Sequence, residues 1–139
     1  MESKDIRWQQ RFQNFERALR SLEEALAIEQ PDVVQRAGLI QFFEITFELA
    51  WKMLKDYLEE QGFTEVKSPR AVLKQAFEVE LIGDGHQWLQ GLQDRNLTAH
   101  TYNEETAVLV ENLVRQTYYP LLSQLRQTFS QLQEQTNDE

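Results

Sequence analysis

The sequence predicts an all-α fold, an up-and-down antiparallel bundle of four to five helices. Three observations lead to this prediction. Apolar residues recur at helical steps of three and four over most of the chain. Only five glycines and three prolines interrupt 139 residues, which leaves long stretches without a helix breaker. No run alternates polar and apolar residues as strands do. We expect a single domain over residues 1–139, long enough to bury a core without disulfides or metal.

The first helix is expected from about Asp5 to Glu29. Six large apolar residues follow one another at steps of four, three, four, three and four, and so form one stripe on a helix. These are Trp8, Phe12, Phe15, Leu19, Leu22 and Leu26. Pro31 cannot continue the hydrogen-bond ladder, and Asp32 can cap the next helix.

The second helix is expected from about Val33 to Gln61, where Gly62 stops it. It is the most apolar element, and one narrow charged stripe remains, supported by the pair Glu48–Lys52 at i,i+4. A helix that is apolar on more than one face is buried from more than one side. In so small a bundle this predicts a homodimer in which a second chain covers part of the helix. The alternative is a central helix of a monomer.

Two short helices follow. Ser68 is the expected N-cap of the third helix, with Pro69 at its first position. Asp84, with Gln87 three residues later, resembles a capping pair that starts the fourth helix. Arg95 is expected near the end of this fourth helix.

The last helix is expected to start at the cap residue Asn103 and to run to about Leu132. Pro120 should kink it, because the proline ring clashes with the carbonyl one turn earlier. The expected apolar stripe is Leu109, Leu113, Leu121, Leu125, Phe129 and Leu132. The polar tail, residues 133–139, is expected to fray.

Composition limits the functional classes. The chain has no cysteine, which removes thiolate chemistry and fits a reducing compartment. Neither a signal peptide nor a membrane-spanning apolar run is visible, so we expect a soluble, cytoplasmic protein. The formal net charge is −9, whereas a general nucleic-acid binder would be basic. An RNA substrate would therefore need a local basic site or a patch formed on assembly, and the acidic surface fits a protein partner equally well.

Potential catalytic groups are densest between Asp94 and Asn103, at the junction of two helical patterns. Arg95 can clamp a phosphate with its planar fork of donors, and His100 can move a proton near neutral pH. Tyr102 adds a hydroxyl that can donate, accept or be modified. On an uninterrupted helix, positions five apart differ by about 140°, so a break between Arg95 and His100 is expected to let both side chains converge. A histidine that merely bonds a helix end is the structural alternative.

Other candidate sites are weaker. His86 is expected to be a surface residue. Glu44 and Glu48 share a helix face, but a two-carboxylate metal site needs further ligands from a facing helix, which the sequence lacks. There is no glycine-rich phosphate loop. No metal and no cofactor are expected.

Four ordered motifs resemble one family. They are Phe43–Lys52, Ser68–Arg70, Leu81–Gly85 and Asp94–Tyr102. Together they make the chain resemble the HepT-like branch of the HEPN domains, long described as nucleotidyltransferase substrate-binding proteins. The resemblance extends over nearly the whole chain and implies a helical bundle that forms homodimers and binds a small nucleotidyltransferase-domain protein.

The resemblance also implies roles for single residues. Arg95 and His100 match the catalytic pair of a metal-independent endoribonuclease, whose motifs from two protomers face one cleft. Tyr102 matches the tyrosine to which the partner enzyme adds AMP, which silences the toxin. Asp94 and Asn96 resemble accompanying positions with less defined roles. We therefore expect a toxin-type ribonuclease. The alternatives are a non-catalytic substrate-binding subunit of a two-component nucleotidyltransferase and a helical interaction protein with a degenerate site.

Overall fold

The computed structural model describes residues 2–138, which form helices joined by short connections, with no strand among them. The α-helices are α1 (Glu2–Leu26), α2 (Val33–Glu60), α3 (Pro69–Glu78), α4 (Gly85–Asp94), α5 (Glu104–Leu113) and α6 (Tyr119–Asp138). A 3₁₀ segment, η1 (Arg95–His100), continues α4, and a π-helical segment, η2 (Val114–Tyr118), joins α5 to α6. The predicted all-α fold is confirmed.

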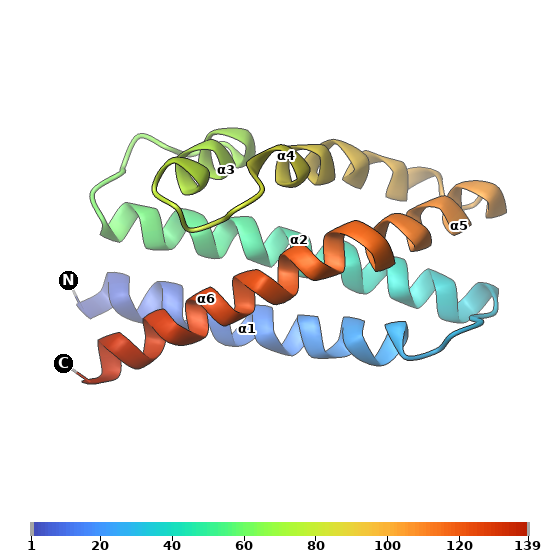
Figure 1. Cartoon of the computed structure of the whole chain (residues 1–139), viewed down its shortest axis with the longest axis horizontal. Helices are drawn as coiled ribbons and strands as arrows, with labels where there is room; N and C mark the ends of the chain where they lie inside the picture. The colour runs from blue at the N-terminus through green and yellow to red at the C-terminus, as the bar shows by residue number, and fades with distance from the viewer. Residues whose placement is uncertain (1, 139) are drawn as a thin grey trace.

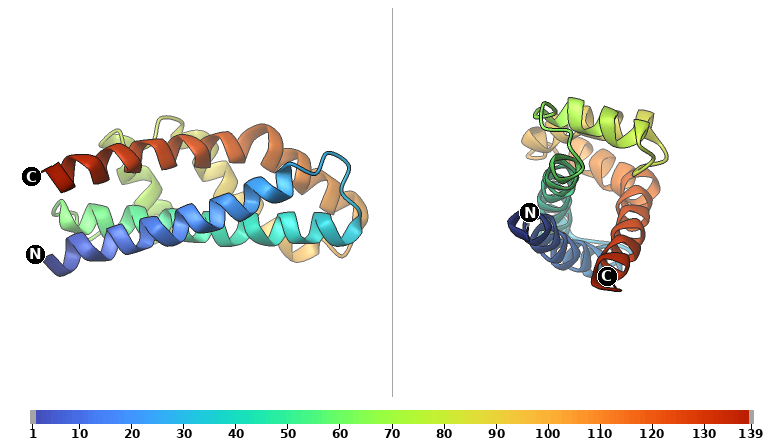
Figure 2. Two further views of the ribbon diagram at one scale, coloured as in Figure 1. Left: turned by 90° about the horizontal axis from the view of Figure 1, so that it is seen from below. Right: turned by 90° about the vertical axis from the view of Figure 1, so that its left-hand side faces the viewer.

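The helices form an elongated antiparallel bundle (Figure 1). Helices α1 and α2 run side by side in opposite directions, α3 and α4 cover another side of α2, and α6 lies against α1. The first and last described residues lie at the same end of the bundle, and the end-on view shows the helices arranged around one axis (Figure 2). Helix α2 contacts α1, α3, α5, α6 and η1, so it is the central element of the chain.

The predicted apolar stripe of the first helix is buried as expected. Its first five residues, Trp8 to Leu22, are at most 1% exposed. Trp8 meets Tyr57 and Phe129 edge-on, with ring centroids 5.3 and 5.6 Å apart. Burying each large apolar side chain contributes about 1.5–3 kcal/mol, so this stripe is a main source of stability for the pairing of α1 with α2 and α6.

The predicted helix starts are also found. Asp32, Ser68, Asp84 and Asn103 each accept a backbone N–H of the first turn of the helix that follows. Gly62 has a φ of 103°, the left-handed conformation that favours glycine just after a helix. These signals act within a few residues of one another, which is why they can be read from the sequence.

The last helical region differs from its prediction in three ways. The chain passes through the π-helical turn η2 before Pro120, where one continuous kinked α-helix was expected. Leu109 is 50% exposed, and of the expected stripe only Leu125 and Phe129 are buried. The rest of the buried face is formed by Ala107, Val110, Val114, Tyr118 and Leu122. The polar tail expected to fray over 133–139 is helical as far as Asp138, beyond the expected end at Leu132.

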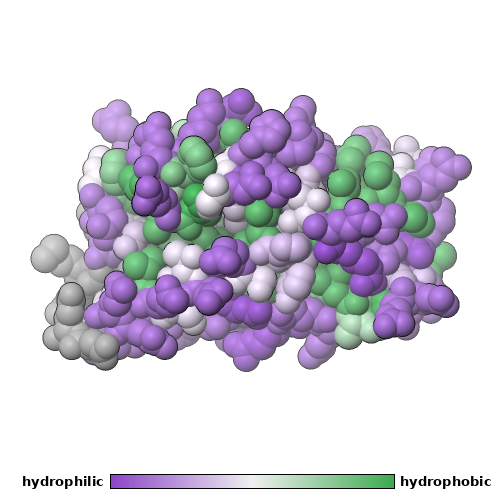
Figure 3. Space-filling view, viewed as in Figure 1, coloured by the Kyte–Doolittle hydropathy of each residue, from purple (hydrophilic) through white to green (hydrophobic). Residues whose placement is uncertain are grey.

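The surface is mostly polar. On the face of Figure 3, green apolar side chains show through in two areas, one towards α3 and one towards α5. Phe77 and Val79 are exposed at the end of α3, and Val108 and Leu109 on α5. Within the described part of the chain, no helix is both long and apolar enough to cross a bilayer.

Candidate functional site

A hollow of about 550 Å³ lies between α2 and η1, and Arg95 of the predicted motif lines it. Helix α2 lines it with Glu44, Ile45, Glu48 and Leu49, and η1 lines it with Arg95, Asn96, Thr98 and Ala99. Its volume falls within the range of about 300–1,000 Å³ that is common for small-ligand sites. The hollow combines one cation, two carboxylates and an apolar wall, so Arg95 is the charged donor through which its lining could bind an anion.

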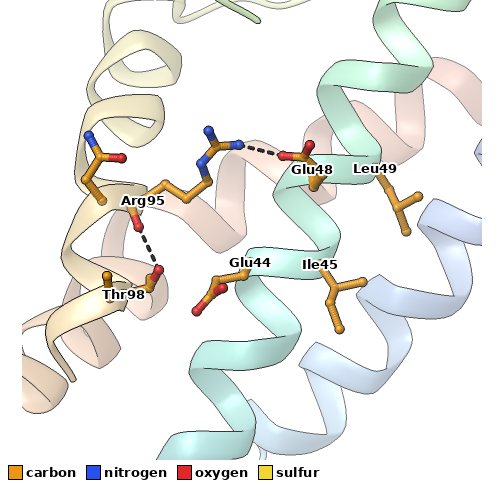
Figure 4. A pocket seen from close by; sticks show the side chains of 8 residues that line it. Glu44, Ile45, Glu48, Leu49, Arg95 and Thr98 are labelled. Carbon is orange, nitrogen blue, oxygen red and sulfur yellow. Dashed lines mark hydrogen bonds and ion pairs between the residues drawn. The ribbon is translucent and has the colours of Figure 1, made fainter. Parts of the chain in front are cut away.

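Arg95 reaches across the hollow to α2 (Figure 4). Its Nη1 donates to Glu48 Oε2 over 2.5 Å, and the two side chains are 29% and 39% exposed. The same Glu48 oxygen accepts the indole N–H of Trp51 at 3.0 Å. Lys52 Nζ lies 3.5 Å from the other oxygen, so Glu48 is held from three sides.

The segment that carries the motif is a 3₁₀ helix, closed by its own side chains. Thr98 Oγ1 donates to the Arg95 carbonyl at 2.7 Å, and Thr101 Oγ1 donates to the Thr98 carbonyl at 3.1 Å. With about three residues per turn, positions five apart point roughly 120° away from each other. Arg95 and His100 therefore leave η1 in different directions.

Asp94, the acid before Arg95, faces the bundle interior. Its Oδ1 accepts the side-chain amide of Gln90 at 3.0 Å, and its Oδ2 accepts the hydroxyl of the buried Tyr118. Burial, together with the hydrogen bond to Asp94, raises the pKa of Tyr118 above its ordinary value. This contact joins the end of α4 to η2, so Asp94 anchors the start of η1.

His100 and Tyr102 lie outside the hollow. Both side chains are exposed, Tyr102 to 87%. Their ring centroids are 6.2 Å apart in an edge-on arrangement. Among the described side chains, no hydrogen bond, ion pair or ring contact joins Arg95 to His100. The structure thus brings His100 next to Tyr102 and leaves Arg95 with Glu48.

Two further candidate residues, Asn96 and His86, lie in separate parts of the structure. Asn96 lines the hollow and is exposed. Exposed His86 lines a different hollow, between α3 and α4. The described residues contain no group of three or more His, Cys, Asp or Glu side chains arranged to hold a metal ion.

Sequence reasoning missed two residues of this region. Glu48 entered the sequence analysis as the partner of Lys52, as part of an incomplete metal site and within the motif Phe43–Lys52, but not as a partner of Arg95, and Tyr118 did not enter it. Glu48 lies 47 positions from Arg95 and Tyr118 lies 24 positions from Asp94. No spacing pattern signals such contacts, because they depend on how the helices pack.

Comparison with known proteins shows which family the chain matches. Residues 10–131 match the family described as nucleotidyltransferase substrate binding protein like. The chain is also similar to a protein named "Probable ribonuclease HepT" from Haemophilus influenzae (strain ATCC 51907 / DSM 11121 / KW20 / Rd). The two are 36% identical over 110 residues, which cover 70% of this chain and 74% of that protein.

Two solved structures share the fold. A protein from Thermus thermophilus superposes with a TM-score of 0.74 at 40% identity, over 80% of this chain and 94% of its own. A Haemophilus influenzae protein, described as revealing the fold of a substrate binding domain of a nucleotidyltransferase, also has a TM-score of 0.74. It is 29% identical, over 84% of this chain and 96% of its own.

Proposed function

This chain belongs to the nucleotidyltransferase substrate binding protein like family, and we propose that it is a HepT-like endoribonuclease controlled by a nucleotidyltransferase partner. One observation carries the proposal. One short segment beside a hollow carries the polar groups of the motif, Arg95, His100 and Tyr102. None of these side chains is buried in the core, so all three are accessible. The similarity to a protein named as a probable ribonuclease supports it.

The chemistry needs only groups that the chain and RNA supply. The 2′-hydroxyl of RNA attacks the adjacent phosphorus, the new 2′-O–P bond forms, and the bond to the 5′-oxygen of the next nucleotide breaks. His100 acts on oxygen as a base towards the 2′-hydroxyl or as an acid towards the leaving oxygen. Arg95 donates to the phosphate oxygens, on which negative charge grows in the transition state. The products are a 2′,3′-cyclic phosphate and a 5′-hydroxyl.

The active form in this proposal is a homodimer. Arg95 and His100 of one chain leave η1 in different directions, so a cleft with several such groups requires a second η1 facing the first. The apolar side chains of Phe42 and Ile45, on α2 beside the hollow, are 36% and 40% exposed and are available for such an assembly.

Tyr102 is the proposed point of control. Its hydroxyl attacks the α-phosphorus of ATP on the partner enzyme, the Tyr O–P bond forms, and pyrophosphate leaves. The 87% exposure of Tyr102 supports this role, because a second protein must reach the hydroxyl. The added AMP is a bulky anion next to His100, and it would exclude RNA by its size and its charge.

A second function has its own support. The family description and one solved relative refer to substrate binding for a nucleotidyltransferase. The formal net charge of −9 also disfavours RNA on most of the surface. In this alternative the chain delivers or shapes the substrate of the partner enzyme and cleaves nothing.

The test is RNA cleavage without metal. Purified protein is incubated with tRNA and total RNA in EDTA, beside Arg95→Ala and His100→Ala. The chain offers a matched control in His86→Ala, since it has two histidines and His86 lies on α4 in another hollow. We expect cleavage by wild type and by His86→Ala, and a loss of at least about a hundredfold for the other two variants, the usual size of general acid–base and electrostatic contributions.

Mass spectrometry of Tyr102 completes the test. Unmodified wild-type protein that leaves RNA intact would contradict the ribonuclease proposal. Increased turnover of the nucleotidyltransferase on addition of this chain would then single out the binding subunit. Equal cleavage by wild type and His100→Ala would mean that His100 is not in the reaction.

A further inference from the structure

We propose that Glu48 is a positioning residue, which fixes the guanidinium of Arg95 in the orientation that meets a phosphate. The inference rests on the proposed function and adds a residue of α2 to the site. It is carried by the contact across the hollow, where Arg95 Nη1 donates to Glu48 Oε2 over 2.5 Å (Figure 4).

Glu48 is itself held in place before it meets Arg95. The indole N–H of Trp51 donates to the same oxygen at 3.0 Å, and Lys52 lies 3.5 Å from the other oxygen. Both neighbours are on α2, the central helix of the bundle, so the carboxylate belongs to a rigid element. Arg95, by contrast, starts a short 3₁₀ segment and has a long side chain with many rotamers. The rigid partner therefore orders the flexible one.

The contact leaves Arg95 able to bind an anion. A guanidinium has five N–H donors, and the described contacts of Arg95 use one nitrogen, Nη1. The Nε and Nη2 edge stays available for the bidentate geometry that arginine uses with phosphate. The Glu48–Arg95 pair is neutral in sum, and Glu44 adds a further carboxylate to the hollow. Phosphate binding at this site then depends on directed hydrogen bonds more than on net charge.

A purely structural role accounts less well for the Glu48–Arg95 contact. Both side chains are about one-third exposed, and ion pairs at such positions contribute little to folding. The other glutamate pairs of α2 lie within the helix or connect it to Arg7 of α1, whereas this pair connects the central helix to the motif segment. Removal of Glu48 should therefore change activity much more than stability.

The first experiment is a double-mutant cycle on RNA cleavage. Its proteins are wild type, Glu48→Ala, Arg95→Ala and the double variant, with Glu48→Gln as the conservative replacement. We expect Glu48→Ala to lower kcat by about tenfold to a hundredfold, the cost of a misplaced catalytic group. The double variant should be no worse than Arg95→Ala, because the two residues act as one unit. Glu48→Gln should recover most of the rate, since its amide oxygen still accepts from Arg95.

The matched control is Glu59→Ala. Glu59 is also an ion-paired glutamate on α2, bound to Arg7 and Lys55 and away from the hollow. Its removal should leave kcat within about twofold of wild type. Additive losses in the cycle would overturn the inference, as would a Glu48→Ala rate equal to that of wild type.

A second measurement does not depend on catalysis. The side-chain ¹⁵N–¹H signals of Arg95, assigned with Arg95→Lys, report how far its guanidinium is restrained. We expect a slowly exchanging, restrained signal in wild type and an averaged one in Glu48→Ala, with the Glu59→Ala spectrum unchanged. An unrestrained Arg95 in wild type would overturn the positioning role. Restraint lost in Glu48→Ala, together with no RNA cleavage by wild type, would contradict only the ribonuclease proposal.

Discussion

At the scale of single residues, one buried carboxylate joins three helices. Glu111 of α5 is 6% exposed. It accepts from Nε of Arg36 and Nε of Arg115, each at 2.8 Å. Arg115 also donates to the carbonyls of Leu26 and Ile28 at the end of α1. Burial acts to raise the pKa of Glu111, but the hydrogen bonds from the two arginines outweigh it and hold the pKa below its ordinary value of 4.5.

Replacing this carboxylate should destabilise the protein in a pH-dependent way. A lowered folded pKa means that the contribution of Glu111 is complete above 4.5 and is lost as pH falls through the folded value. We expect Glu111→Gln to reduce the free energy of unfolding by about 3 kcal/mol at pH 7, because the partly buried Arg36 and Arg115 lose the buried carboxylate that they share. The deficit should shrink at pH 3, because below 4.5 the unfolded chain gains stability by binding a proton at this carboxyl, which the folded state resists.

Urea unfolding at both pH values measures this effect. Glu105→Gln is the control, since Glu105 is an exposed acid near the start of the same helix. It should change stability by less than about 0.5 kcal/mol. A Glu111→Gln deficit of equal size at pH 7 and pH 3 would contradict the assignment of the charge as its cause.

At the scale of elements, the junction between η1 and α5 decides how the motif is presented. Asn103 caps α5, with its side-chain oxygen accepting from the backbone of Glu105 at 2.9 Å and of Thr106 at 3.4 Å. Its own backbone N–H donates to the carbonyl of His100 at 3.2 Å. The cap therefore connects the end of the motif segment to a regular helix, and Tyr102 is exposed in the turn between them.

Loss of this cap should loosen the start of α5. We expect Asn103→Ala to lower the free energy of unfolding by about 1 kcal/mol, the usual cost of removing an N-cap. The amides of Glu105 and Thr106 lose their acceptor, so their hydrogen exchange should accelerate more than that of Val110. Asn103→Asp keeps an acceptor oxygen at the same position and should restore protection. Unchanged exchange at both amides in Asn103→Ala would refute the capping role.

The other irregular element is the π-helical turn η2. Pro120 has no N–H and its ring clashes with the carbonyl four residues earlier, so an α-helical ladder cannot pass it undisturbed. The wider turn of η2 accommodates the proline without this clash. Its last residue, Tyr118, donates its hydroxyl to Asp94 and packs against Gly91. A Cβ added to Gly91 would lie 3.0 Å from the Tyr118 ring. A proline in the last helix thus supports the start of the motif segment across the bundle.

At the scale of the whole molecule, the proposed dimer requires an exposed apolar surface. Phe42 and Ile45 on α2 are exposed, whereas the neighbouring Phe43, Thr46 and Phe47 are buried inside the chain. They lie beside the hollow that holds Arg95, and Ile45 lines it. A second chain seated on this side of α2 would therefore bring its own motif segment close to the first.

A charge at this surface should separate the protomers. We expect wild type to be a dimer by light scattering and Ile45→Asp to be a folded monomer, because a buried unpaired carboxylate is costly. Val79→Asp, at an exposed apolar position after α3, should remain dimeric. Circular dichroism confirms that both variants stay helical. A wild-type monomer, or a dimeric Ile45→Asp, would contradict this interface.

The sequence alone determined the fold class, the buried stripe of α1 and the caps at Asp32, Ser68, Asp84 and Asn103. All of these follow from interactions between residues at most a few positions apart, and such interactions leave a periodic or short-range signature. The motif residues were also identified as candidates, because their chemistry and their place between two helical patterns are visible in the sequence.

Only the tertiary structure decided how these parts meet. It paired Arg95 with Glu48 and Asp94 with Tyr118, and it separated Arg95 from His100 through the 3₁₀ geometry of η1. It also buries Val110 in the core and leaves Leu109 exposed. The physical reason is the same in each case. The rotation of a helix about its axis depends on the joint packing of all its neighbours, and no local pattern of residue types specifies it.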